Sequence, residues 1–500
     1  MAEDARSADG EVDLGPADDP DADDVDSASA ALFVSRIVTQ AVGFFALVYY
    51  ARVLGPAGLG VFFTFQTLVS VLGIASEFGV SGAVTKRMSQ AVTERQRGAF
   101  LTGAFVLMLA PFGVVSLGVV LFGHRLSQFV GLDAVVPLLV FVLAVNASAQ
   151  MLISALRGER QISVTAWVSL AGQFVRVVVS VGFLLAGFGA VALVYGIAAS
   201  SLTRSASAFG LLNTTPAVPR FETIRSLFDF SKYTAGMEVS DLAYNWADTL
   251  VLAVFASKSV VGVYETAWKL SFVTLLAAQV IGVALAPSVT NWHESGQMEK
   301  VAEAFRHGVT YSLLFVVPSI VGVAVLGEEI LSALYGFTTG ATILLVLVVG
   351  QLAQAVKNVS QNVLFGVNRP EAVFWTNVVT VGANVVLNLA LVPRFGGIGA
   401  AAATLATATV AALAQLYTLR STIPLSVDAG AIAWQVVLAG VVGGVLLLVR
   451  PHVPGVTTPW VFALVALAVA VYGTGLLAHG GMRERLLDAL PVSKLPVSLS

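Results

Sequence analysis

Cysteine is absent from this chain of 500 residues, and charged residues are scarce. Without a thiol the protein has no disulfide, no cysteine nucleophile and no thiolate metal site. Charged residues make up 11% of the chain, against roughly 25% in soluble domains, which is too few to cover a water-facing surface. Histidine is also rare, and each copy stands alone near the end of an apolar segment, so we expect no metal and no other cofactor. The five are His124, His293, His307, His452 and His479.

Apolar residues are abundant instead, and they occur in runs long enough to cross a membrane. They account for 57% of the chain, and the mean hydropathy is +0.86. A helix of about 20 apolar residues spans a hydrocarbon core of about 30 Å and satisfies its own backbone groups there. The polar and apolar alternation typical of a membrane β-barrel is absent. The sequence therefore predicts an all-α, multi-pass protein of a cell membrane, with no nucleic-acid partner.

Charged residues and Gly/Pro breaks divide the chain into fourteen candidate transmembrane helices. The first six lie near 31–51, 59–84, 99–122, 134–156, 162–187 and 190–212. The other eight lie near 233–256, 260–290, 307–326, 340–366, 371–393, 398–420, 430–450 and 458–479. The predicted parts are a first lobe at 31–212, a cytoplasmic linker at 213–232, a second lobe at 233–420, helices 13 and 14 within 421–482, and a cytoplasmic tail at 483–500.

The first 30 residues differ from the rest, because they carry eleven Asp or Glu and a single Arg. Such a segment buries too little apolar surface to offset its ordering entropy, so we expect a disordered acidic tail. The segment lacks the basic start of a cleaved signal peptide, so the first apolar segment is expected to stay in the mature protein.

Lysine and arginine set the orientation, since they concentrate in cytoplasmic loops. With the N-terminus inside, the inner loops and the C-terminal tail hold seventeen: Lys86, Arg87, Arg95, Arg97, Arg157, Arg160, Arg204, Arg220, Arg225, Lys232, Lys300, Arg306, Arg369, Arg420, Arg483, Arg485 and Lys494. The outer loops hold five: Arg52, Arg125, Lys258, Arg394 and Arg450. Both termini are therefore predicted to be cytoplasmic.

The chain repeats itself, which is a common way to build a transporter. The run Gly60-Val61-Phe62 returns 202 residues later as Gly262-Val263-Tyr264. Likewise, Gly189-Ala190-Val191-Ala192 returns 208 residues later as Gly397-Ile398-Gly399-Ala400. Both copies start on the same side, so we expect two six-helix lobes that form parallel repeats around a central cavity, with two extra C-terminal helices.

Three motifs resemble signatures of one transporter family. They are Arg52-Val53-Leu54-Gly55-Pro56-Ala57-Gly58-Leu59-Gly60, the run Asp248-Thr249-Leu250-Val251-Leu252 leading to Val261-Gly262-Val263-Tyr264, and Gly396-Gly397-Ile398-Gly399-Ala400-Ala401-Ala402. In order and spacing they resemble the polysaccharide-biosynthesis flippases, the Wzx-like branch of the multidrug/oligosaccharidyl-lipid/polysaccharide exporter superfamily. The resemblance covers about residues 31–480. It implies transport of a lipid-linked oligosaccharide between leaflets by alternating access, with glycosyltransferases as possible partners.

One predicted helix carries an unusual acidic stripe. Glu238, Asp241, Asn245 and Asp248 follow one another at steps of 3, 4 and 3 residues, which places them on one helical face. An ionised side chain at the bilayer centre costs about 2.5 to 3.5 kcal/mol, so this face should line water. We expect Asp241, Asp248 and Glu238 to take up H+ or Na+ and to couple an ion gradient to transport.

Other intramembrane polar residues repeat between the lobes and form the candidate substrate site. The first lobe supplies arginines suited to a phosphate or pyrophosphate, and amides suited to sugar hydroxyls. The candidates are Arg36, Gln40, Asn146, Gln150, Gln173, Arg176, Gln354, Asn358, Asn377, Asn384 and Asn388.

Several of these residues also have simpler interpretations. Arg36 has the alternative of snorkelling to the interface, and Glu238 that of being solvated near the inner surface. Glu77 is either a ligand or a partner of a cation in the first lobe. Glu265 and Lys269, at positions i and i+4, are expected to form a local ion pair.

Three rival functions remain. A drug or organic-cation exporter of the same superfamily would use the acidic stripe, but it would gain nothing from arginines in the first lobe. A membrane-embedded glycosyltransferase or polymerase would need acidic residues on a sizeable outer loop, and the predicted outer loops are short. A non-transporting partner of glycosyltransferases would have no reason to keep polar stripes inside both lobes. We therefore expect a transporter and not an enzyme.

Overall fold

The computed structural model describes residues 20–452 and 458–478 of the protein, with side chains throughout except at 20–34, 36, 237, 239–244, 277, 280, 283, 284, 286 and 287. All secondary structure in these ranges is helical. The first bundle contains α1 (Pro20–Glu77), α2 (Val80–Gln90), α3 (Glu94–Leu121), α4 (Gly123–Val130), α5 (Val135–Gly158), α6 (Ile162–Leu185) and α7 (Val191–Leu211). The second bundle contains α8 (Phe221–Phe255), α9 (Lys258–Val273), α10 (Leu276–Glu294), α11 (Met298–Ser312), α12 (Val316–Tyr335), α13 (Ala341–Gly366), α14 (Pro370–Leu419), α15 (Ala429–Val449), the 3-10 turn η1 (Arg450–His452) and α16 (Thr458–Ala478).

Two long helices bend sharply at a glycine that separates two predicted segments. Gly55 in α1 has φ 64° and is followed by Pro56. Gly396 in α14 has φ 55° and is preceded by Pro393. Glycine adopts positive φ without a steric penalty, and proline removes a helical hydrogen bond. The sequence therefore located both bends correctly, at the breaks near 55 and 396.

Hydropathy supports fewer membrane crossings than the fourteen predicted. Within the described residues, nine helical stretches are long and apolar enough to cross a membrane. Several stretches hold more than one helix or predicted segment, such as Ile37–Glu77 and Pro370–Leu419. The predicted segments on α7, on α8 and on α9 with α10 are not among the nine. The all-α, multi-span architecture is confirmed, whereas the count of fourteen stays a prediction.

The ends of the predicted parts need two adjustments. Helix α1 begins at Pro20, so residues 20–30 of the segment predicted to be disordered are helical, while residues 1–19 lie outside the described residues. Helix α8 begins at Phe221, so the predicted linker at 213–232 is helical over its second half. The predicted tail at 483–500 also lies outside the described residues.

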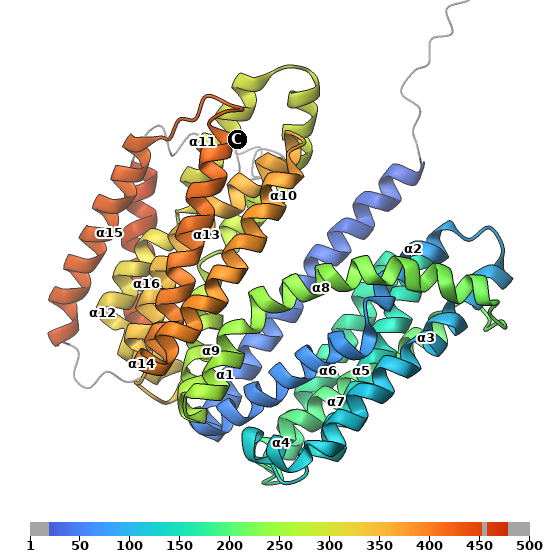
Figure 1. Cartoon of the computed structure of the whole chain (residues 1–500). Helices are drawn as coiled ribbons and strands as arrows, with labels where there is room; N and C mark the ends of the chain where they lie inside the picture. The colour runs from blue at the N-terminus through green and yellow to red at the C-terminus, as the bar shows by residue number, and fades with distance from the viewer. Residues whose placement is uncertain (1–19, 453–457, 479–500) are drawn as a thin grey trace, which may run out of the picture.

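The two bundles meet at one end of the molecule and diverge toward the other (Figure 1). They meet where α9 lies against the bend of α1, and the ends that carry α2 and α11 are far apart. The largest apolar cluster lies at this junction and combines both bundles: it includes Leu59 and Phe63 of α1, Val261 and Tyr264 of α9, and Leu344 of α13.

Helix α8 crosses from one bundle to the other (Figure 1). Its first half packs tightly on the first bundle, where the Thr234 hydroxyl donates to the Gly79 carbonyl at 2.6 Å. A Cβ on Gly79 would lie 2.3 Å from the Ala235 nitrogen, and Gly79 also has φ 67°. This approach requires glycine, which explains the break between α1 and α2 at this position.

Candidate functional site

The bundles touch through two glycines that the sequence repeat pairs. A Cβ on Gly60 of α1 would lie 1.7 Å from the Lys258 carbonyl oxygen, and a Cβ on Gly262 of α9 would lie 2.0 Å from the Pro56 carbonyl oxygen. Each repeat thus presents its own glycine to the backbone of the other. Small residues allow such close helix crossings in membrane proteins. The repeated Gly-Val-aromatic motif therefore marks the contact between the two bundles.

Asp248 of α8 is the centre of a polar cluster inside the second bundle. Its carboxylate accepts hydrogen bonds from the Tyr264 hydroxyl at 2.5 Å, the Thr404 hydroxyl at 2.6 Å and the Asn388 amide nitrogen at 2.6 Å. The Asn388 amide also donates to the Asn384 side-chain oxygen at 3.1 Å. Three elements, α8, α9 and α14, therefore hold one carboxylate through two hydroxyls and one amide N–H. Carboxylate oxygen is a ligand type that hard cations prefer.

A cavity of about 50 Å³ extends from this cluster between α8, α9, α13 and α14. It is much smaller than the roughly 300–1,000 Å³ of a typical small-molecule site, but at about 10–15 Å³ each it holds a few waters or a small ion. Its polar lining is Asp248, Gln351, Gln354, Lys357, Thr380, Asn384, Thr404 and Thr407.

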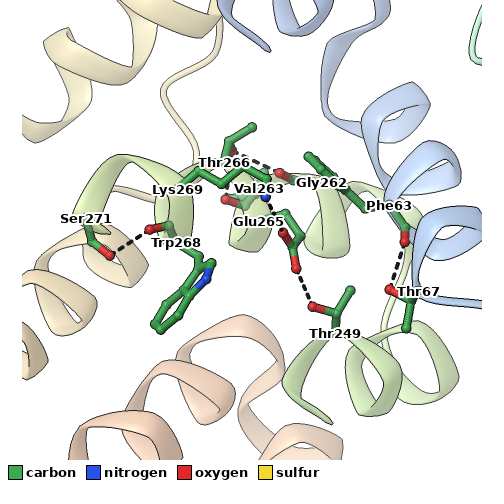
Figure 2. Close-up of polar contacts among 10 residues, drawn as sticks. All are labelled: Phe63, Thr67, Thr249, Gly262, Val263, Glu265, Thr266, Trp268, Lys269 and Ser271. Carbon is green, nitrogen blue, oxygen red and sulfur yellow. Dashed lines mark hydrogen bonds and ion pairs between the residues drawn. The ribbon is translucent and has the colours of Figure 1, made fainter. Parts of the chain in front are cut away.

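Glu265 and Lys269 form the predicted ion pair, at 3.7 Å, at the junction between the bundles (Figure 2). The Glu265 side chain is only 4% exposed and also accepts a hydrogen bond from Thr249 of α8, whereas the Lys269 side chain is 39% exposed. The Lys269 ammonium lies 5.4 Å from the ring centroid of Phe63 in α1. Lys269 therefore carries a half-exposed positive charge on the side of the second bundle that faces the first.

Arg204 organises the polar interior of the first bundle, although the sequence analysis placed it in an inner loop. It lies within α7 and donates to the Asn146 side-chain oxygen at 3.1 Å and the Gln150 side-chain oxygen at 3.4 Å. A Cβ on Gly172 of α6 would lie 2.6 Å from its Cγ. The structure therefore places Arg204 within helix α7, against Gly172, and not in a loop.

The acidic stripe of α8 divides between two places. Glu238 is half-buried, accepts a hydrogen bond from the Ser81 hydroxyl at 3.3 Å and interacts electrostatically with Glu77 of α1. Glu77 is 8% exposed and also interacts with Arg204. Ten residues of helix, about 15 Å, separate Glu238 from Asp248, so these carboxylates belong to different sites.

Arg176 and Gln173 of α6 face α1 within the first bundle. The Arg176 guanidinium lies 5.8 Å from the ring centroid of Phe62 and interacts electrostatically with Tyr50. A Cβ on Gly43 would lie 3.2 Å from the Gln173 amide nitrogen. Arg176 also interacts electrostatically with Arg204, so the two arginines contribute to one positive region.

The remaining candidates do not gather at a single site. Gln354 lines the cavity of the second bundle, whereas Asn358 accepts from Asn362 and faces α10 at Gly282. Gln40 is exposed on α1, and Asn377 is half-buried on α14. The side chains of Arg36 and Asp241 lie outside the described residues.

Sequence reasoning missed several residues that the structure adds to these sites. Lys357 is 8% exposed and lines the cavity, and its signal was a lone lysine inside a predicted apolar segment. Arg204 likewise stands inside the predicted helix 190–212. Tyr264 belongs to the repeated motif but was not predicted as a site residue, and Thr404 has no signal of its own, because only the fold brings them to Asp248.

Comparisons with known proteins agree with this architecture. Residues 49–338 match the family model described as "Polysaccharide biosynthesis protein". The chain is 30% identical over 465 residues to "Probable low-salt glycan biosynthesis flippase Agl15" of Haloferax volcanii, covering 92% of this chain and 97% of that protein. It is 28% identical over 479 residues to "Probable flippase AglR" of the same organism, covering 93% and 98%.

Two solved structures share the fold. The structure described as "Lipid II flippase MurJ, inward closed conformation" superposes with a TM-score of 0.73 at 14% identity, covering 89% of this chain and 98% of that one. An inward-facing multidrug resistance MATE family transporter of the MOP superfamily gives 0.60 at 15% identity, covering 77% and 94%. At these identities the likeness concerns the fold alone. The family match and the full-length relatives place this multi-pass membrane protein in the polysaccharide biosynthesis protein family.

Proposed function

We propose that the protein flips a lipid-linked oligosaccharide, carried on a polyprenyl phosphate or pyrophosphate, from the cytoplasmic to the outer leaflet for polysaccharide or glycan assembly. The relatives named as probable flippases support this function. The observation that carries it is the positive region of the first bundle, where Arg176 and Arg204 lie among amides. An anionic headgroup gains from such a region, whereas a cationic drug does not.

The headgroup is proposed to bind between the bundles. The side-chain oxygens of Asn146 and Gln150 accept hydrogen bonds from the Arg204 guanidinium. These bonds orient the guanidinium, a group well suited to binding phosphate. Lys269, half-exposed and fixed by the buried Glu265, adds a cation from the second bundle. The lipid tail stays in the bilayer, because apolar chains gain nothing from entering a polar site.

Transport is proposed to be coupled to H+ or Na+ at Asp248. The cavity beside this carboxylate admits waters or a small ion but not a sugar. Its ligands come from α8, α9 and α14, so cation binding there would tie these helices together. We further propose fourteen crossings, cytoplasmic termini, location in the cell membrane, alternating access of two six-helix lobes, and glycosyltransferases as suppliers of the substrate.

The test is transbilayer movement of a fluorescent polyprenyl-diphosphate sugar in liposomes that contain the purified protein. We expect Arg176→Ala and Arg204→Ala to slow movement strongly, and Asp248→Asn to abolish its dependence on an ion gradient. The matched controls are Arg394→Ala and Asp133→Asn, which change exposed residues that are not among the partners of Arg176, Arg204 or Asp248 described above. Equal movement by the arginine variants and by Arg394→Ala would remove the basis of the proposal.

A further inference from the structure

Two of the five basic residues predicted on the outer side lie at the junction between the bundles. They are Arg52, in α1 just before the Gly55 bend, and Lys258, at the first residue of α9. Basic residues are infrequent on the outer side of membrane proteins. Their position beside the glycine crossing of α1 and α9 links them to the closure of this end.

Arg52 of the first bundle binds the end of a helix in the second bundle. Its Nε donates to the Leu334 carbonyl at 3.0 Å, and its Nη2 donates to the Ala333 carbonyl. These carbonyls belong to the last turn of α12, which ends at the left-handed Gly336. Unpaired carbonyls and the negative end of the helix dipole favour a cation there.

Lys258 makes the reciprocal contact, from the second bundle to the first. Its ammonium donates to the Thr64 hydroxyl at 3.2 Å and lies 4.7 Å from the ring centroid of Phe129. Burial lowers the pKa of Lys258 to about 8, because desolvation disfavours the ammonium. The Lys258 ammonium is therefore less stable in the closed arrangement than in water, and hydration or a bound anion would stabilise it.

The partners of both cations are neutral. In the described part of the chain they are two main-chain carbonyls, one hydroxyl and one aromatic ring, with no carboxylate among them. An ionised acceptor adds Coulomb attraction to a hydrogen bond from a cation, and a phosphate can also bind a guanidinium through two parallel bonds. A phosphate that reaches these residues would therefore compete successfully for both.

We propose that Arg52 and Lys258 form a gate at this end, which closes on neutral groups of the opposite bundle and, when the bundles part, binds the phosphate or diphosphate of the departing lipid. This inference rests on the proposed function for the identity of the ligand. The gate itself follows from the contacts, since none of the four can persist if α1 and α4 of the first bundle move away from α9 and α12.

The experiment measures the distance between spin labels on the two bundles at this end. The absence of cysteine allows Gln128→Cys and Thr339→Cys to be labelled directly, and both positions are exposed. Each variant is compared in detergent without ligand and with farnesyl diphosphate. The set is wild type, Arg52→Ala, Arg52→Lys, Lys258→Ala and the outer-loop control Arg394→Ala.

Without ligand, we expect Arg52→Ala to raise the ratio of long to short distances about tenfold, which corresponds to about 1.4 kcal/mol. The control Arg394→Ala should leave this ratio unchanged. Arg52→Lys should fall between, because it keeps the charge but loses the two-point contact. Farnesyl diphosphate should lengthen the distance in wild type, whereas Arg52→Ala and Lys258→Ala should need about tenfold more ligand.

A wild-type distance distribution for Arg52→Ala would overturn the gate. An unchanged response to diphosphate in Lys258→Ala would overturn the anion site. Neither measurement requires transport. If the distance changes occur as expected but the protein does not flip lipid, the result counts against the proposed function and not against the gate.

Discussion

The glycine crossing between the bundles yields the sharpest prediction, for Gly262→Ala. The new Cβ would lie 2.0 Å from the Pro56 carbonyl oxygen and 2.9 Å from the Gly60 nitrogen. Ordinary contact begins at about 3.4 Å, and both obstacles are backbone atoms that cannot rotate away. Helix α9 must therefore move from α1 by more than an ångström, which disturbs the largest apolar cluster of the molecule.

The expected magnitude follows from two opposing effects. Overpacking in a well-packed interior costs about 1–3 kcal/mol, and more when the backbone must move. Replacing glycine by alanine within a helix returns up to about 1 kcal/mol. The net prediction is a clear loss of stability for Gly262→Ala, and a similar loss for Gly60→Ala.

A matched control separates the effect of the close helix contact from the general effect of replacing glycine by alanine. Gly113 lies within α3, and a Cβ there would meet nothing within 4 Å, so Gly113→Ala should leave the protein equally or more stable. The assay is the thermal midpoint of monodisperse protein in detergent, followed by tryptophan fluorescence. A midpoint for Gly262→Ala at or above that of wild type would refute the close crossing.

Three further predictions concern the polar sites. Asp248→Asn should keep a folded protein but lose the response of flipping to a Na+ or pH gradient, measured in liposomes. Glu265→Gln should lower the thermal midpoint by an amount that corresponds to about 1–3 kcal/mol, because the amide keeps a single acceptor oxygen and the ionised partner of Lys269 is lost. Lys258 has a pKa of about 8 in the closed arrangement and about 10.4 when hydrated, so proton binding favours the open form. Lowering the pH from 10 to 8 should therefore lengthen the spin-label distance; its described partners Thr64 and Phe129 do not titrate in this range.

Much of the fold was readable from the sequence, because it depends on hydropathy and on glycine and proline. All fourteen predicted segments fall on helices, and several boundaries agree within a residue or two, such as 341–366 for α13. The predicted repeat also brought Gly60 and Gly262 together. Apolar runs and breakers act locally, so a single sequence suffices to find them.

The sites were less accessible to sequence reasoning, since they depend on contacts between distant helices. Helical phase placed Glu238 and Asp248 on one face, but it could not reveal that their neighbours come from different bundles. Counting charges by loop misplaced Arg204, because the helix that holds it continues to Leu211. Tyr264 became a partner of Asp248 only through the packing of α9 on α8.

The most direct test of the central claim is whether the wild-type protein alone moves a polyprenyl-diphosphate sugar between leaflets. Liposomes carry the fluorescent lipid in both leaflets, and a membrane-impermeant quencher added outside then reports whether lipid of the inner leaflet reaches the outer one. We expect quenching to become complete with the protein and to stay limited to one leaflet in protein-free vesicles. Limited quenching in both, together with export of an organic cation dye by the same protein, would contradict the account and favour a cation antiporter.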